Sequence, residues 1–101
     1  ETEIYKVQIS ADVKKDDWIM GPSSMVAYSS SDGTNFKEII SKKIPVLTPQ
    51  DSDKIYNYEL TFYPIKTNYV KVLVKRTPVL PQWHPAKGAP AFLFVDEIEI
   101  F

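Results

Sequence analysis

Residues 24–46 read SMVAYSSSDGTNFKEIISKKIPV, and this stretch does most to decide the fold class. The runs at 24–31 and 36–46 both have the composition of strands, and Asp32 and Gly33 lie between them. An Asp-Gly pair between strand-like runs is a strong hairpin signal, because glycine tolerates the positive φ that a tight turn requires. The stretch therefore predicts two antiparallel strands joined by a turn.

Further strands are predicted on both sides of this hairpin. Residues 3–13 and 54–63 alternate between apolar and polar side chains, as half-buried strands do. The clearest alternation is in residues 69–76, YVKVLVKR, with valines on one face and lysines on the other. Residues 91–101 are predicted to close the chain as a last strand. Short strands and frequent turn signals, without a helical period, predict an all-β sandwich or barrel.

The composition restricts the classes of function. A chain of 101 residues with 44% hydrophobic and 25% charged residues is expected to form one globular domain, residues 1–101. The formal net charge is −1 and the basic residues are scattered, so no nucleic-acid-binding stripe is indicated. No apolar run reaches the roughly 18 residues that a membrane span needs. The absence of cysteine excludes a disulfide framework and thiolate chemistry.

Three loops separate the predicted strands, at 14–23, 47–54 and 77–90. Because consecutive strands in such a fold usually run antiparallel, these loops are expected at one end of the sandwich. The turns at 32–35 and 64–68 are expected at the other end. Loops gathered at one end of a rigid scaffold commonly carry function.

The loop at 77–90 holds Trp83 next to His84, between prolines. An indole offers a flat apolar face to the C–H groups of a pyranose ring, so Trp83 is a candidate sugar platform. Four polar side chains are candidates to hydrogen-bond the sugar hydroxyls: Arg76, Gln82, His84 and Lys87. The alternative is that Trp83 packs beneath its own loop in a small satellite core, and the residues leave both readings open.

Trp18 follows two aspartates and precedes Ile19 and Met20 in the loop at 14–23. This apolar run resembles a plug over one end of the sandwich, which favours a structural role. Trp18 is also a candidate ligand contact, because its loop is expected to share an end with Trp83.

No catalytic constellation is apparent. His84 is the only histidine, so a zinc site would be built almost wholly from carboxylates, and no Gly-x-Ser-x-Gly motif marks a nucleophile. Glu97 and Glu99 share one face of the last predicted strand, with Asp96 opposite. Such carboxylates suit acid-base chemistry or calcium. A solvated face, or a charged edge that resists further pairing, is the reading that the residues favour.

Three stretches resemble a known family. AYSSSDGTNFKEI at 27–39 resembles the strand-turn-strand of discoidin-like domains, also called coagulation factor 5/8 type C domains, and TNYVKVLVKR at 67–76 resembles their penultimate strand. LPQWHPAKGAPAFLFVDEIEIF at 80–101 is more specific. It resembles the end of the C-terminal discoidin-like domain of Bacteroides-type bacterial chitobiases, which are β-N-acetylhexosaminidases. The resemblance covers nearly the whole chain.

The resemblance implies a jelly-roll β-sandwich of the galactose-binding type. It implies a non-catalytic accessory domain that binds a glycan containing N-acetylglucosamine or galactose. The parent would be a secreted, periplasmic or cell-surface glycoside hydrolase acting on N-acetylhexosamine glycans. Trp83 and His84 match the family's loop before the last strand, and Glu97 matches a position that helps to hold a structural calcium ion in many relatives. The alternative is a structural module that packs on the parent's catalytic domain and binds no sugar. Membrane-surface binding, as in some discoidin relatives, needs a basic rim that only Lys87 and Arg76 would supply, and is disfavoured.

Two departures from the family pattern qualify these expectations. Ala86 stands where the family has glycine, so the loop has less backbone freedom. The family's first strands and its Asp-rich calcium segment precede Glu1, so we expect a fragment of a larger protein with an incomplete calcium site. We also expect an open sheet edge that pairs with a second copy or with the preceding chain.

Overall fold

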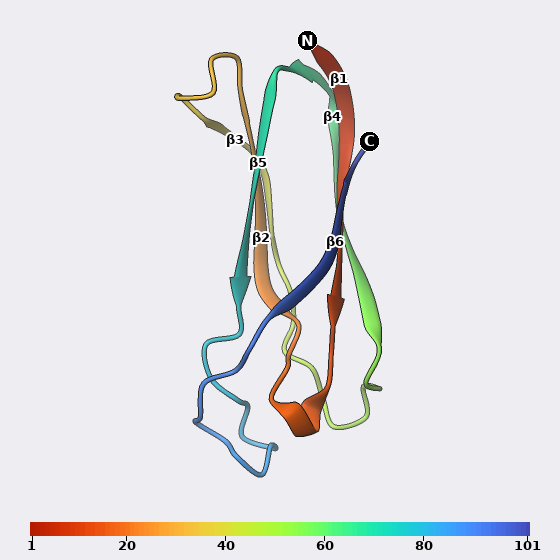
Figure 1. Cartoon of the computed structure of the whole chain (residues 1–101), viewed down its shortest axis with the longest axis vertical. Helices are drawn as coiled ribbons and strands as arrows, with labels where there is room; N and C mark the ends of the chain where they lie inside the picture. The colour runs from red at the N-terminus through yellow and green to blue at the C-terminus, as the bar shows by residue number, and fades with distance from the viewer.

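The computed structural model describes residues 1–101 and contains six strands and one turn of 3-10 helix. The elements are β1 (Thr2–Asp12), η1 (Lys15–Asp17), β2 (Pro22–Ser30), β3 (Lys37–Lys43), β4 (Ile55–Thr67), β5 (Tyr69–Arg76) and β6 (Phe94–Ile100). The strands form two antiparallel three-stranded sheets, in the orders β4-β1-β6 and β3-β2-β5. The sheets lie face to face (Figure 1), so the predicted all-β fold is confirmed. No helix here is long and apolar enough to cross a membrane.

β2 and β3 are the only consecutive strands that pair directly, which confirms the predicted hairpin. The connection at residues 31–36 is longer than a tight turn, and it is closed by side chains. The Asp32 carboxylate accepts hydrogen bonds from the backbone N–H groups of Asn35 and Thr34 and from the Ser30 hydroxyl. These bonds hold the pKa of Asp32 well below its usual range. Gly33 takes φ 77°, the left-handed conformation that the Asp-Gly signal predicted.

The main core lies between the sheets. Its fully buried members alternate along the strands, and they are Val7 and Ile9 on β1, Met25 and Ala27 on β2, and Leu60 on β4. The β5 valines and the β3 isoleucines pack around them and are partly buried. The pattern of apolar residues at every second position therefore decides which face of each strand is buried.

β4 is longer than the sequence predicts, and the expected break at residues 64–68 is wrong. β4 runs through Pro64 and ends at Thr67. It is an edge strand, where the missing N–H of a proline costs little. Its pairing with β1 also slips: Ile4 lies opposite Ile65, but Lys6 lies opposite Thr61. Pro64 therefore falls in a bulge, where the sheet ladder needs no donor.

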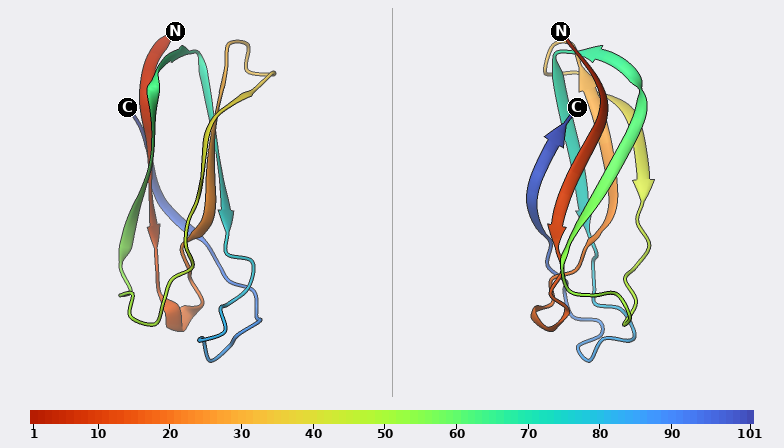
Figure 2. Two further views of the ribbon diagram at one scale, coloured as in Figure 1. Left: turned by 180° about the vertical axis from the view of Figure 1, so that it is seen from behind. Right: turned by 90° about the vertical axis from the view of Figure 1, so that its right-hand side faces the viewer.

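The three long loops lie together at one end of the sandwich, as predicted (Figure 1). The β2–β3 connection and the β4–β5 corner lie at the opposite end (Figure 2). The last loop is longer than predicted, because β6 begins at Phe94 and residues 91–93 lie outside it. The molecule measures 48 × 22 × 18 Å, and its radius of gyration of 15.2 Å exceeds the roughly 13 Å of a compact chain of this length. The sandwich is therefore narrow and elongated.

Candidate ligand-binding site

A second, smaller core fixes the loop end. Its buried members come from two of the loops, and they are Met20, Leu80 and Ala91. Leu47 from the third loop packs against them and is partly buried. Backbone hydrogen bonds add to this packing, since Leu80 N–H donates to the Ala89 carbonyl and Met20 N–H donates to the Phe92 carbonyl. The loops therefore form one connected unit.

Trp83 belongs to this unit. Its ring is partly buried against the second core, and its indole N–H donates to the Leu47 carbonyl at 2.9 Å. That bond ties the loop before β6 to the loop after β3. The geometry is that of the satellite-core alternative, with part of the ring left at the surface.

His84 is 5% exposed, and both of its ring nitrogens are bonded within the chain. Nδ1 accepts the Ala86 N–H at 3.0 Å, so the proton lies on Nε2, which donates to the Lys15 carbonyl at 2.7 Å. His84 therefore joins two loops and offers no free nitrogen to a ligand.

The other polar candidates divide into two groups. Arg76 donates from Nη1 to the Ala91 carbonyl at 3.2 Å, so it holds the end of the loop that precedes β6. Gln82 and Lys87 are exposed and make no side-chain hydrogen bond or ion pair within the chain. Of the four predicted hydrogen-bonding residues, these two are available to a ligand.

Trp18 takes an unusual position in the loop between β1 and β2. It ends the 3-10 turn at φ 64° and ψ 19°, and it is the only non-glycine residue with a positive φ. A bulky residue in this left-handed region is rare and costs roughly 1–3 kcal/mol. Ile19 and Met20 are buried behind it, which confirms the expected plug. Trp18 itself is 36% exposed and lies outside the plug.

Lys15 holds this loop in place. Its carbonyl accepts the Trp18 N–H and the His84 Nε2–H. Its ammonium group lies 3.1 Å from the Asp53 carboxylate and also bonds to the Asp51 carbonyl. The Lys15 backbone N–H donates to Asp53, and this bond, with the ammonium, lowers the pKa of Asp53. All three loops therefore meet at Lys15.

Phe92 is a surface aromatic that sequence reasoning missed. The sequence pattern predicts that it lies in the last strand, but it lies in the loop and is 50% exposed. Its N–H donates to the Trp18 carbonyl at 2.9 Å, and its backbone bridges to Ile19. The exposed side chains of Trp18 and Phe92 therefore project from adjoining backbone segments. The aromatic-rich run AFLF at 91–94 was the available signal, but it fits a strand equally well.

Glu97 lies apart from this end, in β6 opposite Ser10. No group of three or more His, Cys, Asp or Glu side chains is placed to hold a metal ion. The residues of this chain do not by themselves assemble the carboxylate set that calcium prefers. The calcium role of Glu97 stays a prediction.

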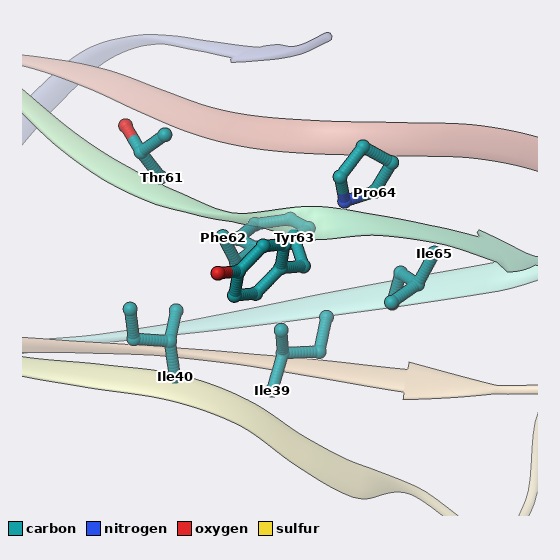
Figure 3. A pocket seen from close by; sticks show the side chains of 7 residues that line it. All are labelled: Ile39, Ile40, Thr61, Phe62, Tyr63, Pro64 and Ile65. Atoms are coloured by element: carbon teal, nitrogen blue, oxygen red, sulfur yellow. The ribbon is translucent and has the colours of Figure 1, made fainter.

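The largest hollow does not coincide with the loop end. A cavity of about 680 Å³ opens at the side of the sandwich, between β3 and β4 (Figure 3). Its lining is mostly apolar: Ile39, Ile40, Thr61, Phe62, Tyr63, Pro64 and Ile65. None of the predicted site residues line it, and it lacks the convergent polar groups that orient a sugar.

Comparison with known proteins gives no family assignment. No family model matches the chain, and no curated protein matches it significantly.

Proposed function

We propose that this chain is a non-catalytic carbohydrate-binding accessory domain whose ligand platform is Trp18 with Phe92. We further propose that the two sheets belong to a jelly-roll of the galactose-binding type. The observation that carries the proposal is the conformation of Trp18. A bulky side chain is held exposed, at a backbone position that glycine or asparagine would occupy at lower cost. Backbone strain of this kind is concentrated at functional sites.

Rigidity supports a binding role for Trp18. Its N–H and carbonyl are bonded to Lys15 and Phe92, and Lys15 is fixed in turn by Asp53 and His84. A loop whose backbone is already fixed loses little entropy when a ligand binds to it. The indole face would meet the C–H face of a pyranose ring.

Polar groups suited to sugar hydroxyls lie on the same loops. Asp16 and Asp17 are exposed in the 3-10 turn before Trp18 and supply acceptors. Gln82 and Lys87 are exposed on the loop before β6 and supply donors. Few groups are desolvated in so shallow a site, so we expect a Kd on the order of millimolar to tens of micromolar.

The proposed parent is a secreted, periplasmic or cell-surface glycoside hydrolase acting on N-acetylhexosamine glycans, as the motif resemblance implies. The domain would hold that enzyme close to its polymeric substrate. Tethering raises the effective substrate concentration without chemistry of its own.

A packing module that binds no sugar is the second candidate. Trp83 and His84 favour it, because the indole N–H and both imidazole nitrogens bond within the chain. Under this proposal the exposed Trp18 and Phe92 would contact a neighbouring domain.

The test is an NMR titration with N-acetylglucosamine, chitobiose, galactose and N-acetylgalactosamine. The chain has two tryptophans, so each indole N–H signal reports one ring. We expect a saturable shift of the Trp18 indole signal that is kept in Trp83→Phe, and saturable shifts of the neighbouring amide signals that are lost in Trp18→Ala. If no sugar shifts the Trp18 signal up to tens of millimolar, the carbohydrate proposal fails and the packing module takes its place.

A further inference from the structure

One side of the sandwich, where β5 and β6 form the sheet edges, is left uncovered. Ile98 and Ile100 of β6 lie opposite the buried Ile9 and Val7 of β1, so they belong to the inner face of their sheet. They are nevertheless 51% and 46% exposed, and every residue of β6 is exposed. On the opposite side, β3 and β4 approach each other across the two sheets. The apolar inner face is therefore unprotected along β6, on the β5/β6 side.

The two strands that border this side carry opposite charges. β6 contains Asp96, Glu97 and Glu99 and no basic residue. β5 contains Lys71, Lys75 and Arg76 and no acidic residue. Each strand is the outermost of its sheet, so each has a row of unpaired backbone N–H and carbonyl groups.

The two bordering strands also run in opposite directions. β1 runs towards the loop end, and β6 is antiparallel to it, so β6 runs away from the loops (Figure 1). β2 runs away from the loops, and β5 is antiparallel to it, so β5 runs towards them. Turning a second copy by 180° about an axis along the strands preserves these directions. Placed open side to open side, the two copies bring β6 of each beside β5 of the other, in antiparallel orientation, at two equivalent seams.

We propose that two copies of this chain form a twofold dimer in which β6 of each copy pairs antiparallel with β5 of the other. The two three-stranded sheets of one copy would continue into those of its partner. The dimer is closed, because each copy uses both of its open edges. Main-chain hydrogen bonds would satisfy both edges, as in other cases of strand addition.

Apolar burial favours this arrangement. The inner-face residues of β6 are Val95, Ile98 and Ile100, and those of β5 are Val70, Val72 and Val74. The β6 residues are exposed and the β5 valines are partly exposed. Both sets would be covered in the dimer, which extends the main core across the twofold axis.

Charge selects the partner. Pairing β6 with β6 would place carboxylates opposite carboxylates, and pairing β5 with β5 would oppose basic residues, both of which are unfavourable. Pairing β6 with β5 sets acidic residues against basic ones. The edge charges thus disfavour pairing of β6 with β6 and of β5 with β5. The strand that complements β6 in charge is β5 of a second copy of the chain.

The test is the oligomeric state of residues 1–101, measured by sedimentation velocity at low and high salt. We expect a dimer of the 11.6 kDa chain that weakens as salt increases. Because each substitution acts at both seams, Glu97→Lys with Glu99→Lys should raise the dimer Kd by more than about a hundredfold. Lys71→Glu with Lys75→Glu should do the same.

Mixing distinguishes lost complementarity from lost folding. The variant with reversed β6 charges has two basic edges, and the variant with reversed β5 charges has two acidic edges. We expect each to be monomeric alone and the equimolar mixture to form a heterodimer. Lys71 also lies over the rings of Tyr28 and Phe36. If the pair unfolds, Lys75→Glu alone serves as the second variant, and a smaller rise in the dimer Kd is expected because Lys71 and Arg76 keep their charge. A monomeric wild-type chain, which would assign the open side to a different partner, overturns the proposal. Dimers indifferent to charge reversal, or variants that do not associate when mixed, also overturn it.

Discussion

The loop of residues 13–21 and the loop of residues 77–93 each present a tryptophan at the same end of the sandwich, yet they use it in opposite ways. Trp83 lies against the second core, and its indole N–H donates a hydrogen bond to the Leu47 carbonyl. Trp18 is exposed at a left-handed backbone position that its neighbours enforce. Trp83 therefore supports the loops, whereas Trp18, with Phe92 from the longer loop, presents the surface. The aromatic that is more conspicuous in the sequence is not the one more available to a ligand.

Among substitutions in these two loops, His84→Ala is expected to have the largest effect on the free energy of unfolding. The change removes one of the two hydrogen bonds to the Lys15 carbonyl, leaves the Ala86 N–H without its partner and opens a cavity beneath the loops. We expect a loss of about 2–4 kcal/mol in the free energy of unfolding. Urea denaturation measures it, with the exposed neighbour variant Gln82→Ala as a control that stays within about 0.5 kcal/mol of wild type. Equal stability of the two variants would contradict the supporting role of His84.

A smaller loss is expected from Trp83→Phe. The substitution keeps an aromatic ring but removes the hydrogen bond to the Leu47 carbonyl, which should cost about 1–2 kcal/mol. The matched change Trp18→Phe removes an N–H that bonds to nothing within the chain, and should cost less. The melting temperatures of the two variants give the comparison, and a larger fall for Trp18→Phe would reverse our assignment of the two rings.

Trp18→Gly separates stability from binding. Glycine adopts φ 64° without the steric cost that tryptophan has there, which favours the folded state. Glycine also raises the conformational entropy of the unfolded chain, which favours unfolding, so the two effects partly cancel. We expect the free energy of unfolding to stay within about 1 kcal/mol of wild type. The sugar-induced shifts of the surrounding amides should disappear. A large loss of stability, seen in the same urea titration, would show that Trp18 supports the loop instead.

The smallest effect expected is a pH dependence of stability that comes from Asp53, the carboxylate bound by Lys15. The pKa of Asp53 is lowered in the folded chain by hydrogen bonds from Lys15, so its contribution to stability is complete above its unfolded pKa, about 3.8. That contribution is lost as the pH falls from there through the folded pKa. Asp53→Asn should therefore reduce the fall in melting temperature between pH 5 and pH 2, and the part of the fall that comes from Asp32 should remain. Parallel curves for wild type and Asp53→Asn would refute the role of this carboxylate.

Local patterns account for most of the fold. Alternation at Val7 and Ile9 predicts the buried face of β1, and the Asp32-Gly33 pair predicts the hairpin. Both signals depend on residues that are neighbours in sequence. The turn predicted at residues 64–68 is wrong in its start, because the effect of a proline depends on its place in the sheet, and an edge strand with a bulge accommodates Pro64.

The sequence by itself determined the all-β class, the hairpin and the gathering of three loops at one end, because strand periodicity and turn chemistry act over a few residues. Only the tertiary structure decided which aromatic is exposed. Trp83 is held by Leu47, 36 residues away along the chain, and His84 by Lys15, 69 residues away. Such pairings depend on how the loops meet in space. The open side is also decided by the tertiary structure. The acidic β6 and the basic β5 can be seen as complementary edges only once the two sheets place both strands on one side of the sandwich.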